Sequence, residues 1–236
     1  MPVPRPLWQR YVAVVLYLLM GFLLVQLLAT ISAGITGIAE QQSKMPFRAL
    51  LFALVIQMIG FLLPAPLLLQ FTRAGNFGFS RASAGDVLLA CGLTFASLVI
   101  FSLIYHALDI RPQQLAFLDQ RELLRHRQAF LVMTAFVVPA YEEWIFRGVI
   151  FGVLATQSQS RRSVIAAGAF TSIVFTLSHI EGKHSYSALP PIFAMALIFH
   201  YVTWRSQSIW PAVTAHAMQN LLSAAALIAK AGEHST

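Results

Sequence analysis

"YVAVVLYLLMGFLLVQLLATI", Tyr11 to Ile31, decides the class of fold, because this stretch contains no Asp, Glu, Lys or Arg. A transmembrane helix needs about 20 predominantly apolar residues to cross roughly 30 Å of hydrocarbon. Ala49 to Phe71 and Val87 to Leu108 are equally free of charge. We therefore expect three transmembrane helices in residues 1–108. The first is expected to be a retained anchor, because its apolar run is longer than that of a signal peptide.

Four further apolar segments follow in residues 129–229, at Ala129 to Thr156, Ser163 to Ile180, Ala188 to Trp204 and Ile209 to Ala229. The pattern predicts an all-α polytopic membrane protein with about seven transmembrane helices, within a range of six to eight. We expect residues 1–236 to form a single integral membrane domain. The connector from Asp109 to Gln128 mixes Leu with Arg and Glu, so it is either a short interfacial amphipathic helix or a solvated loop.

The composition agrees with a membrane protein and excludes several other classes. Of the 236 residues, 58% are hydrophobic and 11% are charged, whereas about a quarter of the residues of a soluble domain are charged. The net charge of +7 arises from Lys and Arg scattered at the ends of apolar runs, which is typical of membrane helices and argues against a nucleic-acid partner. Cys91 is the single cysteine, which excludes an intrachain disulfide and a zinc cluster built from cysteines. Lys and Arg are balanced between alternate loops, so they do not predict an orientation.

Three charges interrupt the fourth apolar segment, in "YEEWIFRG", Tyr141 to Gly148. Each charge costs about 2.5 to 3.5 kcal/mol at the centre of a membrane helix. Glu143 and Arg147 lie four residues apart on one helix face, so we expect them to form an ion pair. Glu142 points about 100° away. A carboxylate inside a membrane without a local partner indicates a functional site and requires a wet cavity or a partner from another helix.

Two later helices supply suitable partners. "FTLSHIEG" places Phe175 and His179 four residues apart, and "HAMQN" places His216 and Asn220 four residues apart. Each pair therefore shares one face of its helix. Pro139 removes a backbone donor, which leaves the Ala135 carbonyl free and allows a kink that admits water. We expect these side chains to meet in a polar cavity within the membrane.

These residues form three patterns in order on three apolar segments: E-E-x-x-x-R, F-x-x-x-H and H-x-x-x-N. Together they resemble the signature motifs of the CAAX-processing and bacteriocin-processing (CPBP, Abi) family of intramembrane proteases. The resemblance covers about the C-terminal hundred residues. It implies an endopeptidase that acts on a membrane-associated or prenylated protein or peptide. The lack of an organelle address favours a bacterial inner membrane.

The chemistry of amide hydrolysis assigns an expected role to each residue. Hydrolysis requires an activated water and donors for the oxyanion. We expect Glu142 to activate the water, His179 to hold or polarise it, and His216 and Asn220 to donate hydrogen bonds to the oxyanion. The supporting residues are Glu143, Arg147 and Phe175. No cofactor is expected in this scheme.

Two alternatives remain open. Glu142, His179 and His216 could instead be the three ligands of a zinc ion that activates the water, although no H-E-x-x-H pattern is present. A chain of another class, a non-catalytic scaffold or a transporter, could use the same residues to bind cargo or relay protons. The identity of the substrate and the oligomeric state do not follow from the sequence.

Two positional expectations can be compared with a structure. At a rise of about 1.5 Å per residue, Glu142 and His216 both lie about 20 Å from the membrane face where the helix of Glu142 begins, whereas His179 lies about 6 Å from that face. These depths conflict with a shared site unless a helix is tilted or a helix boundary is wrong. His200 is expected to make a hydrogen bond between helices rather than to line the cavity.

Overall fold

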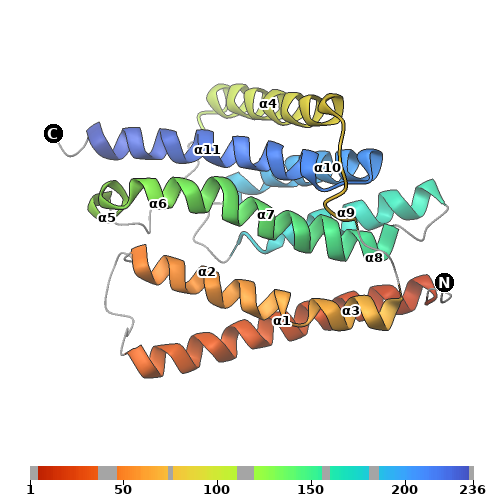
Figure 1. Ribbon diagram of the computed structural model, residues 1–236. Helices are drawn as coiled ribbons and strands as arrows, with labels where there is room; N and C mark the ends of the chain where they lie inside the picture. Colours follow the sequence, from red (N-terminus) through yellow and green to blue (C-terminus); the bar gives the residue numbers. More distant parts are fainter. Residues whose placement is uncertain are drawn as a thin grey trace.

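The computed structural model describes residues 5–36, 47–73, 77–110, 120–155, 160–180 and 186–233, and these residues are almost entirely helical (Figure 1). Within them the structure contains no β-strand, only an isolated bridge between Gly78 and Ser208. The prediction of an all-α fold is confirmed. The elements are α1 (Leu7–Thr36), α2 (Phe47–Leu62), α3 (Ala65–Thr72), α4 (Ala84–Ala107), α5 (Gln120–Arg125), α6 (Arg127–Val132), η1 (Met133–Val137), α7 (Val138–Glu143), η2 (Trp144–Phe151), α8 (Gly152–Ala155), α9 (Arg161–Leu177), η3 (Tyr186–Ala188), α10 (Leu189–Ser206) and α11 (Trp210–Glu233).

Six helical stretches of the described chain are long and apolar enough to cross a membrane. They are Leu7–Ile31, Phe47–Thr72, Ala84–Ala107, Arg127–Ala155, Tyr186–Ser206 and Trp210–Gly232. The prediction of a polytopic integral membrane protein is therefore confirmed, and six spans lie at the lower end of the predicted range. The remaining predicted span, Ser163 to Ile180, is helical only as far as Leu177, and α9 has 17 residues. A helix of that length reaches about 26 Å, less than the roughly 30 Å of a bilayer core.

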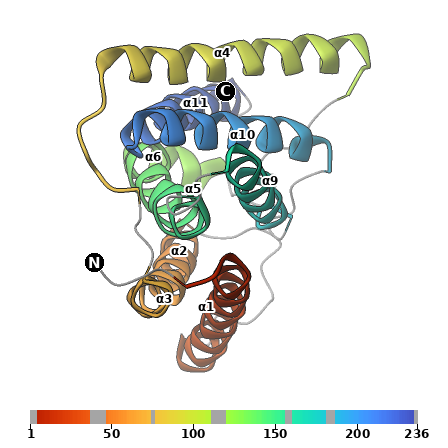
Figure 2. The same cartoon turned by 90° about the vertical axis from the view of Figure 1, so that its right-hand side faces the viewer.

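The helices lie in layers, an order that Figures 1 and 2 both show. Helix α4 runs along one side of the molecule against α10 and α11. The interrupted helix from α6 to α8 lies in the middle, with α9 beside it, and α1, α2 and α3 form the opposite side. Helix α1 reaches the middle layer through Val14 and Tyr17, which belong to the same buried cluster as Val149 and Val153. The middle layer is thus covered on two sides by other helices.

Helices α1 and α2 cross closely because two glycines meet there. A Cβ atom on Gly60 would lie 2.5 Å from the Val25 side chain and 3.1 Å from the Gly21 carbonyl oxygen. The Tyr17 hydroxyl donates a hydrogen bond of 2.8 Å to the Phe61 carbonyl next to this crossing. Small residues at such crossings allow the two backbones to approach, which increases van der Waals contact between membrane helices.

A short strap, residues 77–83, joins the N-terminal and C-terminal halves of the chain. The Phe77 N–H donates to the Gly148 carbonyl at 3.2 Å, and a Cβ atom at position 148 would lie 3.0 Å from the Phe77 oxygen. The Ser80 hydroxyl donates to the Gln207 carbonyl at 2.8 Å. These bonds place the start of α4 beside the end of α10 and the start of α11. We call this the Ser208 end of the molecule, and the opposite end, where α4 finishes, the Asp109 end.

The connector between α4 and α6 is only partly described, and Leu115 and Leu118 lie outside the described residues. Its C-terminal part forms α5, whose Leu123 is 3% exposed and packs in a cluster with Phe47, Phe130 and Ala224. This part of the connector is therefore packed against the bundle, rather than forming a solvated loop.

Candidate active site

The helix that carries Glu142 is interrupted by π-helical turns on both sides of α7. The Val138 N–H donates to the Met133 carbonyl, five residues earlier. At that spacing the Thr134 carbonyl would need an N–H from Pro139, and proline has none. The Asn220 side chain donates to the Thr134 carbonyl instead, at 2.9 Å. The carbonyl that Asn220 satisfies is thus one residue before the Ala135 carbonyl that the sequence led us to expect.

Glu143 lies at the centre of a buried polar cluster. Its Oε1 accepts from an Arg147 guanidinium nitrogen at 2.9 Å and contacts His216 Nδ1 at 2.8 Å. The side chains of Glu143 and Arg147 are both 0% exposed. The Arg147 guanidinium also lies 4.4 Å from the ring centroid of Phe175 and 5.2 Å from that of Phe199. The predicted ion pair between Glu143 and Arg147 is confirmed, and Glu143 also contacts His216.

Glu142 has different surroundings from its neighbour, as the helix geometry predicts. Its side chain is 18% exposed and faces a cavity, and its Oε2 lies 3.8 Å from His216 Nε2. This oxygen is buried and makes no hydrogen bond with the described residues. Because the 3.8 Å contact is longer than a hydrogen bond, the carboxylate keeps an oxygen for a water or a substrate.

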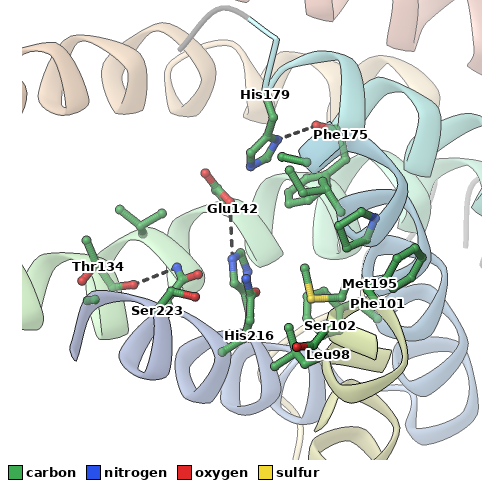
Figure 3. Close-up of a pocket in the computed structure, with 18 of the residues that line it drawn as sticks. Leu98, Phe101, Ser102, Thr134, Glu142, Phe175, His179, Met195, His216 and Ser223 are labelled. Atoms are coloured by element: carbon green, nitrogen blue, oxygen red, sulfur yellow. Dashed lines mark hydrogen bonds and ion pairs between the residues drawn. The ribbon is translucent and has the colours of Figure 1, made fainter. Parts of the chain in front are cut away.

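His179 lies two residues beyond the end of α9, and Figure 3 shows it on the other side of Glu142 from His216. Its Nδ1 lies 2.7 Å from the Phe175 carbonyl oxygen. That carbonyl can only accept, so Nδ1 carries the proton, and in a neutral ring Nε2 is the acceptor nitrogen.

The depth calculation for His179 was wrong because it assumed that this helix crosses the whole bilayer. The contact between Phe175 and Arg147 shows instead that α9 ends beside the junction of α7 and η2.

Glu142, His179, His216 and Asn220 line one cavity of about 680 Å³ (Figure 3). Pockets that bind small molecules usually have volumes of about 300 to 1,000 Å³. The walls are mostly apolar, and α4, which carries none of the motifs, contributes Leu98, Phe101 and Tyr105. The predicted intramembrane cavity is present, and all four predicted catalytic residues line it.

The sequence interpretation missed two polar residues of the cavity, Gln219 and Ser223. The signal was available, because they lie three and seven residues after His216, on the same helix face. It also missed Phe199, which stacks on the His216 ring with centroids 5.4 Å apart. His200 is not among the residues lining the cavity, as expected. Its Nδ1 lies 2.6 Å from the Ala196 carbonyl oxygen of its own helix and 3.1 Å from the Ser172 hydroxyl of α9.

The described residues contain no group of three His, Cys, Asp or Glu side chains placed to hold a metal ion. Glu142 and His216 are neighbours. His216 Nδ1 faces Glu143 and His179 Nδ1 faces the Phe175 carbonyl, so each ring would have to bind a metal through Nε2. Zinc ligands lie about 2.0 to 2.2 Å from the metal, in a tetrahedral arrangement. The three residues would therefore have to move together to coordinate zinc.

Comparisons with known proteins agree with the three motifs. Residues 126–222 match the family described as type II CAAX prenyl endopeptidase Rce1-like. A candidate membrane peptidase of Bacillus subtilis, YdiL, is 32% identical over 90 residues, which cover 38% of this chain and 34% of YdiL. The membrane-embedded CAAX protease MroQ of Staphylococcus aureus is 32% identical over 94 residues, 39% of this chain and 36% of MroQ.

The matched part of the chain spans about a third of the length of each of these relatives. No solved structure matches the chain significantly. Both relatives come from bacteria, as expected for a bacterial membrane protein. All four predicted catalytic residues lie inside the matched range. Residues 126–222, which make up less than half of the chain, are thus similar to a family of membrane-embedded CAAX endopeptidases.

Proposed function

We propose that this protein is an intramembrane endopeptidase that hydrolyses a peptide bond of a membrane-associated protein or peptide, such as a prenylated one of CAAX type. The observation that supports the proposal is the single cavity that Glu142, His179, His216 and Asn220 line together. Peptide hydrolysis needs a base that activates water and donors for the oxyanion, and these four side chains can supply both. The names of the matching family and of the relatives also favour a peptidase.

In this proposal Glu142 takes a proton from a water molecule, and the hydroxide attacks the carbonyl carbon of the scissile bond. The proton then passes to the leaving amine. His179 holds the water, since the neutral ring accepts at Nε2 while Nδ1 donates to the Phe175 carbonyl. Glu142 and His179 would thus share the water between them.

His216 and Asn220 are the proposed oxyanion donors. Glu143 occupies Nδ1 of His216, so the ring donates through Nε2 only when both nitrogens carry protons. Asn220 uses one N–H of its amide for the Thr134 carbonyl, and the amide group has a second N–H for the oxyanion. Loss of one such donor commonly costs about 2.7 to 4 kcal/mol of transition-state stabilisation.

The test is Glu142→Gln, which keeps the shape of the side chain but cannot accept the proton. We expect the cleavage products seen by mass spectrometry in membranes with the wild type to disappear, because a general base contributes about 10² to 10⁴-fold. Glu122→Gln is the matched control, since Glu122 lies on α5 and is not among the residues lining the cavity. A folded, inserted Glu142→Gln protein that still gives all the products would overturn the proposal and favour a scaffold or a transporter.

The zinc form of the same protease is the alternative mechanism, with Glu142, His179 and His216 as ligands. We propose metal-free chemistry, because the described residues contain no group of three His, Cys, Asp or Glu side chains placed to hold a metal ion, and the sequence contains no H-E-x-x-H pattern. We expect the purified protein to keep its peptidase activity after treatment with 1,10-phenanthroline and dialysis. Inactivation that added zinc reverses would show that the metal mechanism is correct.

A further inference from the structure

One face of α11 carries four polar side chains that line the cavity: His216, Gln219, Asn220 and Ser223. Positions i, i+3, i+4 and i+7 lie on the same side of a helix. The proposed hydrolysis uses His216 and Asn220 and leaves Gln219 and Ser223 without a role. We call these four residues the α11 strip.

Gln219 and Ser223 have no partner among the described residues. Neither side chain makes a hydrogen bond to another described residue, although both are partly buried. Other helix hydroxyls bond to their own helix, such as Thr134 to the Phe130 carbonyl at 2.7 Å and Thr214 to the Trp210 carbonyl at 2.9 Å. Two polar side chains that face a mostly apolar cavity without a partner among the described residues are suited to bind a ligand.

A peptide that is cut inside a membrane has a need that such groups can meet. A transmembrane segment satisfies its N–H and C=O groups within its own helix. To expose one peptide bond to Glu142, the segment must unwind locally, which frees several of these groups. Leu98, Phe101 and Met195 of the cavity wall cannot bond to them, and unpaired peptide groups in apolar surroundings are costly.

The strip has the right length and chemistry for a stretch of main chain. From His216 to Ser223 a helix rises about 10 Å, and an extended chain rises about 3.3 Å per residue. The strip therefore runs beside about three residues of extended peptide. Gln and Ser each carry both a donor and an acceptor and no charge, so they match main-chain N–H and C=O groups better than a charged side chain.

We propose that Gln219 and Ser223 bind the main chain of the unwound substrate on the side of the scissile bond that faces Ser223. This inference rests on the proposed peptidase function. It assigns substrate binding to two residues that the three motifs do not specify, while the chemical step stays with Glu142. Removing their hydrogen bonds should therefore weaken substrate binding more than it slows the chemical step.

The test uses the full-length protein in lipid nanodiscs and a fluorescent farnesylated CAAX peptide as the probe. Gln219→Met together with Ser223→Ala removes the hydrogen bonds and keeps the cavity filled, and Thr214→Ala is the control for loss of a hydroxyl on α11 outside the cavity. Binding is measured by anisotropy in the Glu142→Gln background. We expect the double substitution to raise the Kd about tenfold to thirtyfold, which corresponds to the loss of two hydrogen bonds. Thr214→Ala should leave Kd unchanged.

A set of probes in which one amide at a time is replaced by an ester identifies the main-chain group. At least one ester should bind Glu142→Gln more weakly, and the same ester should cause no loss once Ser223 and Gln219 are replaced. Hydrolysis by the otherwise wild-type protein should show a raised KM and a kcat within about twofold. Each of these readouts separates a lost contact with the main chain from a general disturbance of the fold.

The outcomes separate this inference from the proposed function. Equal Kd values with and without the double substitution, or no binding of the probe to either protein, would overturn the role of the strip. Binding that weakens as expected, with no hydrolysis by the wild type, would keep the strip as a peptide site and contradict the peptidase proposal. Hydrolysis with an unchanged KM would keep the peptidase and remove Gln219 and Ser223 from substrate binding.

Discussion

Glu142 and Glu143 are adjacent in the chain but lie in opposite surroundings. Glu143 is 0% exposed and contacts both Arg147 and His216, whereas Glu142 faces the cavity. Because a buried carboxylate is stable only with partners, the Arg147 pair allows Glu143 to hold His216 without leaving an unpaired charge. Glu142 is thus available for chemistry, while Glu143 holds Arg147 and His216 in place through its Oε1.

This arrangement predicts the effect of removing the arginine. Arg147→Met leaves Glu143 as a buried charge with only His216 as its partner, and breaking a buried pair on one side typically costs about 3 to 5 kcal/mol of folding stability. We expect a large fall in the unfolding temperature in detergent micelles. Adding Glu143→Gln should recover part of that loss, because the second change removes the unpaired charge. Two substitutions whose effects on stability simply add would contradict the pairing.

At the scale of the helical element, the glycines predict where helix packing is tight. Gly60→Ala places a Cβ atom 2.5 Å from Val25 and 3.1 Å from the Gly21 backbone oxygen, so α1 and α2 must move apart. We expect a loss of about 1 to 3 kcal/mol in stability, as for other overpacked sites. Gly92→Ala in α4 is the control, since a Cβ atom there meets nothing within 4 Å. It should be neutral or slightly stabilising, because Ala favours helix.

The same substitution also separates stability from activity. No residue of α1, α2 or α3 is among those lining the cavity. Folded Gly60→Ala protein should therefore hydrolyse peptide at the wild-type rate per molecule, measured below its lowered unfolding temperature. A fall in kcat as large as that of a cavity substitution would show that the N-terminal helices act on the site.

Helix periodicity and apolar length account for what the sequence predicted at this scale. They predicted the helices, the Glu143 and Arg147 pair, and the four residues that share the cavity. They did not predict that His216 contacts Glu143, because that contact depends on how α11 is rotated against α7. The predicted span extends to Ile180 across the polar residues Ser178 and His179, so the end of α9 at Leu177 was not predicted. The carbonyl freed near Pro139 depends on π-helical spacing, which packing rather than propensity determines.

At the scale of the whole molecule, the cavity lies toward one end of the bundle. Its lining includes Ile110 after α4, Ala188 before α10, and Ser223 and Ala224 in the second half of α11. All of these belong to the Asp109 end. The strap from Phe77 to Ser83 holds the other ends of α4, α10 and α11 together at the Ser208 end. Because the cavity lining reaches the Asp109 end while the strap ties the helices together at the Ser208 end, we predict that water and substrate enter from the Asp109 end.

Cysteine labelling tests this direction, and the chain is suited to it because Cys91 is its only cysteine. In a Cys91→Ser background, Ser223→Cys should react with a membrane-impermeant maleimide added to the same face of sealed vesicles as Asp109→Cys. Arg81→Cys, which is exposed at the Ser208 end, should react only from the opposite face. This labelling test does not rely on the distribution of Lys and Arg among the loops, which did not predict an orientation. Reaction of Ser223→Cys from the face that labels Arg81→Cys would mean that the cavity opens at the Ser208 end, and the direction argued from its lining would be wrong.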